Sequence, residues 1–127
     1  ALPSDFARVV AIAWNGSMEA ARAVTASLPL LQKADRVVIA AFRTCPTEVS
    51  RSEELRTYLE RHDVRAETEE RECKGFVGAD LLEVTQALSA DLLVMGAFTR
   101  SRVGQTAYGA VTQHVLENSA IPVLMAR

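Results

Sequence analysis

The residues best suited to chemistry in this sequence lie between positions 95 and 112, and their types suit the binding of an anion. The segment holds two arginines, three hydroxyl side chains ahead of Tyr108, and glycines at 96, 104 and 109. Glycine allows a ligand to approach the backbone closely, while arginine and hydroxyl groups donate hydrogen bonds to phosphate oxygens. The composition therefore favours a phosphate-binding loop.

No catalytic centre can be assembled from the remaining polar residues. His62 and His114 have no Asp or Ser partner at a telling spacing, and the sequence has no Walker A motif. Glu69, Glu70 and Glu72 form a run of charge typical of an exposed strand, so we expect no metal site there. The sequence therefore predicts a protein that is not an enzyme.

The elements on either side of this segment would place it at one end of a sheet. An uninterrupted apolar run at residues 92–95 precedes it, and helical spacing follows from residue 109 to about 118. An apolar run ended by a glycine is typical of a strand buried on both faces of a parallel sheet. The segment is therefore predicted to be the loop between that strand and the next helix, where ligands bind in open α/β sheets.

Strands and helices alternate along the whole chain, without internal repeats or low-complexity linkers. Further strands are predicted at residues 8–14, 36–43, 64–72 and 121–126. Helices are predicted from Ser17, a good N-cap, then over about residues 50–62 and 77–89. Pro29 lies within the first helix and is expected to kink it or to end its regular part. This order predicts one domain, residues 1–127, with a parallel sheet and right-handed crossovers.

The charge of the third strand sets the expected strand order. Residues 64–72 belong at a sheet edge, where charge discourages unwanted pairing. We therefore expect a single open five-stranded parallel sheet with order 3-2-1-4-5 and helices on both faces, a Rossmann-like α/β fold. The turn at Trp14 and Asn15 would then face Gly96 across a crevice between strands 1 and 4. Trp14 could stack on a base there, or fill the crevice and exclude a ligand, and the sequence leaves both open.

The last strand, residues 121–126, is as apolar as the central strands although this order places it at an edge. Pro122 agrees with an edge, because proline cannot donate to a strand ladder. An apolar, uncharged edge is an aggregation hazard unless something covers it. We expect the same strand of a second copy to cover it in a two-fold homodimer. Cover from a helix or from the N-terminal tail is the alternative.

Length and charge exclude several classes of protein. The chain has 127 residues, enough for one domain with a core and too few for two. Fourteen basic and 16 acidic residues give a net charge of -2 without a basic block, so no nucleic-acid partner is expected. No apolar run approaches the ~20 residues of a membrane span. Cys45 and Cys73 lack metal-binding or redox spacing, so we expect free thiols in a cytoplasmic protein.

Nearly the whole chain resembles a universal stress protein domain. Residues 9–24 (VVAIAWNGSMEAARAV) resemble the first strand and helix of that family, and residues 91–98 (DLLVMGAF), 109–112 (GAVT) and 121–125 (IPVLM) resemble its closing half. The WNGS turn looks most like the second half of bacterial tandem universal stress proteins, and the sequence leaves open whether this chain is whole or half of such a protein. The resemblance implies the same five-stranded fold, shared with adenine nucleotide alpha hydrolases, dimerisation through the fifth strand and, in one subgroup, ATP binding.

The nucleotide-binding subgroup carries Gly, two residues, Gly, nine residues, Gly, then Ser or Thr. Gly96 and Gly109 match its first and third glycines, whereas Thr99 stands at the second and Ala110 at the hydroxyl position. Asn15 stands where many members have Asp. Losing the hydroxyl contact costs roughly 1.5–3 kcal/mol, and a left-handed Thr99 would cost about 1–2 kcal/mol. Together, the lost hydroxyl contact and the left-handed Thr99 predict an affinity lower by about a hundredfold or more.

The resemblance thus implies a stress-response protein with a weak ATP or AMP site between strands 1 and 4. Trp14, Asn15 and Ala41 would line the base and ribose. The residues that would line the rest of the nucleotide come from the fourth strand, its loop and the next helix: Met95, Gly96, Thr99, Arg100, Gly109, Ala110, Val111 and Thr112. The alternative is an interaction module that has lost its ligand and works through its fifth strand, with an unknown protein as a further partner.

Overall fold

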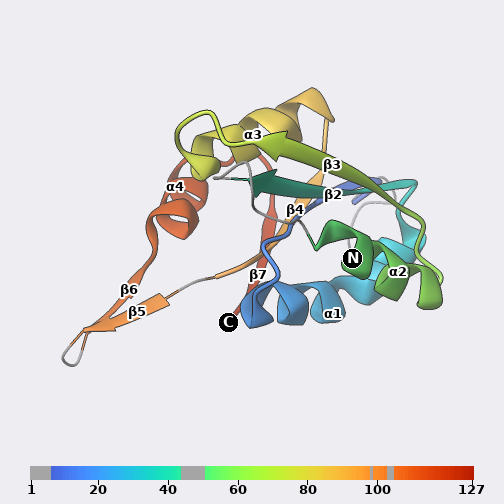
Figure 1. The fold of residues 1–127 in the computed structure, drawn as a ribbon, viewed down its shortest axis with the longest axis horizontal. Helices are drawn as coiled ribbons and strands as arrows, with labels where there is room; N and C mark the ends of the chain where they lie inside the picture. The colour runs from blue at the N-terminus through green and yellow to red at the C-terminus, as the bar shows by residue number, and fades with distance from the viewer. Residues whose placement is uncertain (1–6, 44–50, 98, 103–104) are drawn as a thin grey trace.

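The computed structural model describes residues 7–43, 51–97, 99–102 and 105–127 and arranges them as a five-stranded sheet, flanking helices and a separate hairpin (Figure 1). The sheet strands are β1 (Val9–Ala13), β2 (Arg36–Arg43), β3 (Ala66–Glu72), β4 (Leu92–Gly96) and β7 (Val123–Ala126). The helices are α1 (Met18–Lys33), α2 (Ser52–Arg61), α3 (Val77–Ala87) and α4 (Ala110–Asn118). The hairpin consists of β5 (Thr99–Arg102) and β6 (Gln105–Tyr108).

The sheet has the strand order that the sequence predicted. The order is β3-β2-β1-β4-β7, and every neighbouring pair is parallel. Because β7 is the fifth strand of this sheet, the order 3-2-1-4-5 is confirmed. Ile12 pairs with Ile39 on one side and with Val94 on the other, which places β1 at the centre. The direction of the crossovers therefore changes between β1 and β4, at the predicted switch point.

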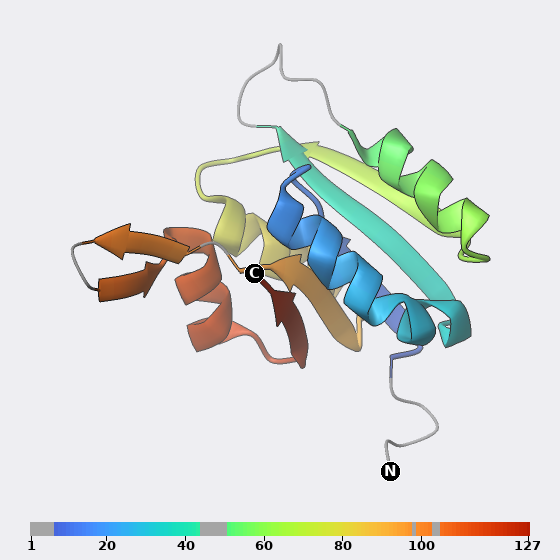
Figure 2. The same ribbon diagram turned by 90° about the horizontal axis from the view of Figure 1, so that it is seen from below.

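Helices cover both faces of the sheet, as predicted. Figures 1 and 2 show α1 and α2 over one face, and α3 and α4 over the other. One core cluster contains Val24 of α1 and Leu59 of α2, and the other contains Leu81 of α3 and Val115 of α4. Because successive strand residues point to opposite faces, the side chains of the central strands alternate between the two clusters.

Helix α1 begins at the predicted N-cap. Ser17 Oγ accepts a hydrogen bond from the Ala20 N–H at 3.2 Å, and Glu19 in the first turn suits the positive end of the helix dipole. An end at Pro29, one of the two outcomes expected there, does not occur, because the helix continues to Lys33. Leu31 is buried in the core, so packing of the last turn against the sheet outweighs the hydrogen bond that proline removes.

The two edges of the sheet differ in charge. Charged β3 forms one edge, as predicted, and Glu67 there accepts two hydrogen bonds from Arg36 of β2, at 2.7 and 3.0 Å. These hydrogen bonds hold the pKa of the Glu67 carboxyl below its ordinary value. Both side chains are largely exposed, so the pair adds little stability and chiefly keeps the edge charged. At the opposite edge, β7 has the sequence VLMA and carries no charge.

The loop expected after β4 is largely a β-hairpin. Thr99 pairs with Tyr108 and Arg102 pairs with Gln105 in an antiparallel ladder. The hairpin extends away from the sheet and helices in both views (Figures 1 and 2). Thr99 therefore has the extended backbone of a strand, and the expected cost of a left-handed conformation does not arise at this residue.

Cys73, which follows β3, is a free and half-buried thiol, as predicted. Cys45 lies outside the residues that the structure describes. Within the described ranges, none of the helices is long and apolar enough to cross a membrane.

Candidate functional site

A cleft of about 460 Å³ opens at the carboxyl ends of the central strands. Its volume falls in the range of about 300–1,000 Å³ that is usual for small-molecule sites. Strands β1, β2 and β4 and helices α3 and α4 all contribute to its wall, through Ala13, Trp14, Asn15, Ala40, Phe42, Val77, Leu81, Met95, Gly96, Gly109, Ala110, Val111 and Thr112. The cleft therefore lies at the switch point, where the sequence predicted a crevice.

The cleft brings together all of the predicted site residues except three. Ala41 does not line it, because the neighbouring residues Ala40 and Phe42 point to this face and strand side chains alternate. The other two, Thr99 and Arg100, lie in β5, and their side chains are outside the described part of the structure. The start of α4 and the end of β4 thus meet as the glycine spacing predicted.

Several lining residues were missed by the sequence prediction. Ala13, Ala40 and Phe42 come from strands that are apolar throughout, and such strands show no alternation that would tell one face from the other. Val77 and Leu81 come from α3, which packs beside α4 on the same face of the sheet. The signal that could have identified Val77 and Leu81 was the connection between β3 and β4. The helix in this connection covers the face of the sheet on which the cleft opens.

Gly96 ends β4 directly beside the first turn of α1. A Cβ atom at this position would contact the backbone N of Ala20 and would lie 2.6 Å from the carbonyl carbon of Glu19. This close approach requires glycine whether or not a ligand binds. Gly96 therefore has a packing role in addition to its place in the cleft wall.

The first turn of α4 opens onto the cleft without a side chain to cap it. Gly109 is the N-cap, and the N–H groups of Ala110 and Val111 have no acceptor within the helix. Among the described lining residues no side chain is charged. The Asn15 side chain forms a hydrogen bond within its own turn, because its Oδ1 accepts from the Ser17 N–H at 3.0 Å. At the start of α4, attraction for an anion therefore comes from the dipole of this helix.

Trp14 borders the cleft and also packs against the core cluster beneath α1 and α2. Its backbone N–H donates to the carbonyl of Ala40 at 2.9 Å, which continues the β1–β2 ladder. The indole Nε1 is buried and has no hydrogen-bond partner among the described residues. A buried donor without a hydrogen-bond partner lowers the free energy of unfolding by roughly 1–3 kcal/mol. With the side chain packed in this way, Trp14 does not fill the cleft.

Comparison with known proteins agrees with this architecture. The chain matches the model of the universal stress protein family over residues 7–127. Its fold is similar to universal stress protein UspA from Lactobacillus plantarum (TM-score 0.76, 14% identity, covering 98% of this chain and 100% of that one). It is also similar to a universal stress protein in complex with cAMP (TM-score 0.74, 22% identity, 97% and 98%) and to an Arabidopsis thaliana universal stress protein family protein with AMP bound (TM-score 0.63, 15% identity, 91% and 87%). No curated protein matches the sequence significantly.

Identities of 14–22% with these structures establish the fold alone. The family model is more specific, because it spans the chain from before β1 to beyond β7 and includes every element of the cleft wall. The chain therefore belongs to the universal stress protein family.

Proposed function

We propose that this protein binds an adenine nucleotide, AMP or ATP, weakly in the cleft between β1 and β4, and acts in the cytoplasmic stress response without catalysing a reaction. The observation that carries the proposal is the cleft itself. It opens at the switch point, and the uncapped first turn of α4 forms part of its wall. Two structural neighbours were solved with cAMP and with AMP, which supports a ligand of this class.

The cleft wall divides into a part that suits a ring and a part that suits a phosphate. Phe42, Val77 and Leu81 offer apolar surface to an adenine ring. The first turn of α4 offers N–H groups and a positive dipole end to a phosphate. Among the described lining residues there is no carboxylate, imidazole or thiol that could act as a base or nucleophile, which supports binding rather than catalysis.

Replacing Val111 with phenylalanine tests whether the nucleotide occupies this cleft. Val111 lies on the cleft wall, is partly exposed and packs against the margin of the core cluster beneath α3 and α4, so the larger ring can extend into the cleft. We expect the affinity for AMP, measured by isothermal titration calorimetry, to fall by at least about tenfold. Thermal stability without ligand should remain close to that of the parent protein.

The matched control is Leu116→Phe, on the same helix. Leu116 is 51% exposed and does not line the cleft, so this change should leave the AMP affinity unaltered. The absence of binding of AMP, cAMP and ATP to the parent protein at millimolar concentration would refute the proposed function. Equal AMP affinity in the Val111→Phe variant and the parent would place the nucleotide elsewhere.

We propose assembly of two copies through β7 as a second role, which would remain if nucleotide binding were absent. β7 pairs only with β4 in the described sheet, and all four of its side chains are half-buried. An uncharged edge strand of this kind is ready to pair with the same strand of another copy. The WNGS turn resembles that of tandem universal stress proteins, and membership of that group stays a prediction. In a tandem protein, a fused second domain would cover β7 in the same way.

A lysine on β7 tests this assembly. We expect Val123→Lys to weaken self-association by at least about tenfold, because an ammonium group would be desolvated between paired edges. Sedimentation velocity across a concentration series measures the change, and a urea melt shows whether the variant is folded. Ala120→Lys is the control, since Ala120 is exposed and precedes the strand. A parent protein that stays monomeric at every concentration would contradict the dimer.

A further inference from the structure

The three methionines of the chain differ greatly in their exposure to solvent. Met18, the first residue of α1, is 66% exposed. Met95 of β4 is only 4% exposed, and Met125 of β7 is half-buried. A thioether is readily oxidised to a sulfoxide, and access to the sulfur decides which methionine reacts. Met18 is therefore the methionine that an oxidant in solution reaches first.

The sulfur atom of Met18 lies beside the guanidinium group of Arg22, one turn further along α1. Arg22 Nη2 donates to Met18 Sδ at 3.5 Å, and Arg22 Nη1 donates to the carbonyl oxygen of Arg127 at 3.0 Å. Arg127 directly follows β7, and Figures 1 and 2 show this end of the chain beside the first turn of α1. One guanidinium group therefore joins Met18 to the end of the edge strand.

Oxidation would change the strength of this contact between Met18 and Arg22. A thioether sulfur is a weak hydrogen-bond acceptor. A sulfoxide is polar, and its oxygen would accept a charge-assisted hydrogen bond from the guanidinium group. Residues four apart lie on the same face of a helix, so the two side chains remain neighbours after oxidation. Because Met18 is exposed, the added oxygen atom disturbs no packing in the core.

We propose that Met18 is a reversible oxidation site, and that its sulfoxide holds Arg22 in a stronger contact between the start of α1 and the end of β7. The oxidant is a hydroperoxide. A lone pair of Sδ attacks the outer peroxide oxygen, so that the S–O bond forms while the O–O bond breaks. The proton of that oxygen passes to the departing alkoxide, which leaves as an alcohol.

This reaction transfers two electrons from the thioether to the hydroperoxide. Methionine sulfoxide reductases, which act on both sulfoxide epimers, would restore the thioether. Oxidation of Met18 would therefore be a reversible way to strengthen the contact between α1 and the edge strand. The inference does not depend on nucleotide binding or on self-association.

Treatment with tert-butyl hydroperoxide, followed by peptide mass spectrometry, tests the site of oxidation. We expect Met18 to be oxidised at least about tenfold faster than Met95, because the Met95 side chain is buried. The half-buried Met125 should also react more slowly than Met18. Dithiothreitol then reduces any oxidised thiols, so that later measurements report the sulfoxide alone.

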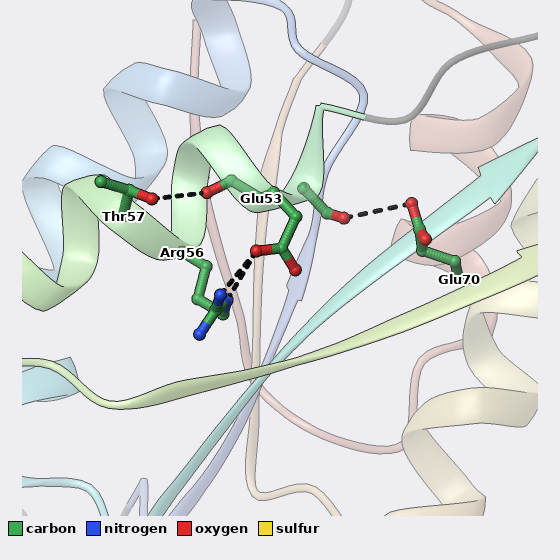
Figure 3. Close-up of polar contacts among 5 residues, drawn as sticks. Glu53, Arg56, Thr57 and Glu70 are labelled. Atoms are coloured by element: carbon green, nitrogen blue, oxygen red, sulfur yellow. Dashed lines mark hydrogen bonds and ion pairs between the residues drawn. The ribbon is translucent and has the colours of Figure 1, made fainter.

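Thermal melts of the oxidised and reduced forms test the role of Arg22. Oxidation of Met18 should raise the melting temperature of the parent protein by about 2 °C. Arg22→Ala removes the donor, so oxidation should no longer raise it. Arg56→Ala is the matched control, because Arg56 is an exposed arginine that pairs with Glu53 on α2 (Figure 3). Oxidation should raise the melting temperature of this variant as in the parent.

Met18→Leu keeps an apolar side chain of similar size but cannot be oxidised, so the hydroperoxide should leave its melting temperature unaltered. Methionine sulfoxide reductases should return the oxidised parent to its original melting temperature. Equal oxidation rates of Met18 and Met95, an oxidised parent no more stable than the reduced one, or the same rise in Arg22→Ala would each overturn the inference. A rise in Met18→Leu would overturn it too.

Discussion

Replacing Gly96 with alanine is expected to lower the free energy of unfolding by about 3 kcal/mol, at the upper end of the usual cost of overpacking a core. The added methyl group would contact the backbone N of Ala20 and lie 2.6 Å from the carbonyl carbon of Glu19. These are backbone atoms in the first turn of α1, so no side-chain rotation can relieve the contact. Either α1 or the end of β4 must move, and Met95, beside Gly96, is buried. Urea denaturation followed by circular dichroism measures the loss.

Gly75→Ala is the matched control for this change. Apart from its chain neighbours, no described residue has an atom within 4 Å of a Cβ built at Gly75, so the methyl group enters open space. We expect the free energy of unfolding to change by less than about 1 kcal/mol, with any gain arising from a less flexible unfolded chain. Equal stability of the two variants would contradict the packing role of Gly96. A Gly96→Ala variant that is as stable as the parent but no longer binds AMP would show that ligand approach alone requires this glycine.

The largest expected gain in affinity comes from restoring a hydroxyl group at position 110. Ala110→Ser places Oγ in the first turn of α4, where Ala110 lines the cleft and is exposed enough to accept an extra atom. A hydrogen bond to a charged phosphate contributes roughly 1.5–3 kcal/mol. The affinity for AMP should therefore rise by about tenfold to a hundredfold. Calorimetric titration of the variant and the parent under the same buffer conditions measures the difference.

The control for this prediction uses both a ligand and a variant. Adenosine lacks the phosphate, so its affinity should be the same for Ala110→Ser and the parent. Ala120→Ser adds a hydroxyl at an exposed residue outside the cleft and should leave AMP binding unaltered. An equal gain for adenosine and AMP would show that the hydroxyl does not act on the phosphate, and no gain for AMP would place the phosphate away from this turn.

Much of the fold follows from local patterns in the sequence. The apolar run at residues 92–95 predicts a buried strand, and the charge of β3 predicts an edge, because each pattern reflects how many faces of the strand are covered. Ser17 predicts the start of α1, since its side chain and the N–H it caps are three residues apart. With the edges known, the strand order and the switch point follow, and with them the meeting of Gly96 and Gly109.

Other features did not follow from local patterns of hydrophobicity and charge. The β5–β6 hairpin was missed because its residues are mostly polar and show no apolar alternation, so the conformation of Thr99 was also wrongly expected. The end of α1 was not at Pro29, because the position of its last turn is decided by contact with the sheet. In both cases a local rule was outweighed by pairing or packing that the sequence pattern does not display.

The sequence by itself determined the five strands of the sheet and their order, the family, and the end of the sheet at which a ligand would bind. Only the tertiary structure decided that Ala40 and Phe42 face the cleft while Ala41 does not, that α3 supplies part of its wall, and that Gly96 is required by the backbone of α1. The physical reason is that patterns of hydrophobicity record whether a residue is buried. They do not record which neighbour buries it, and a strand covered on both faces looks the same from either side.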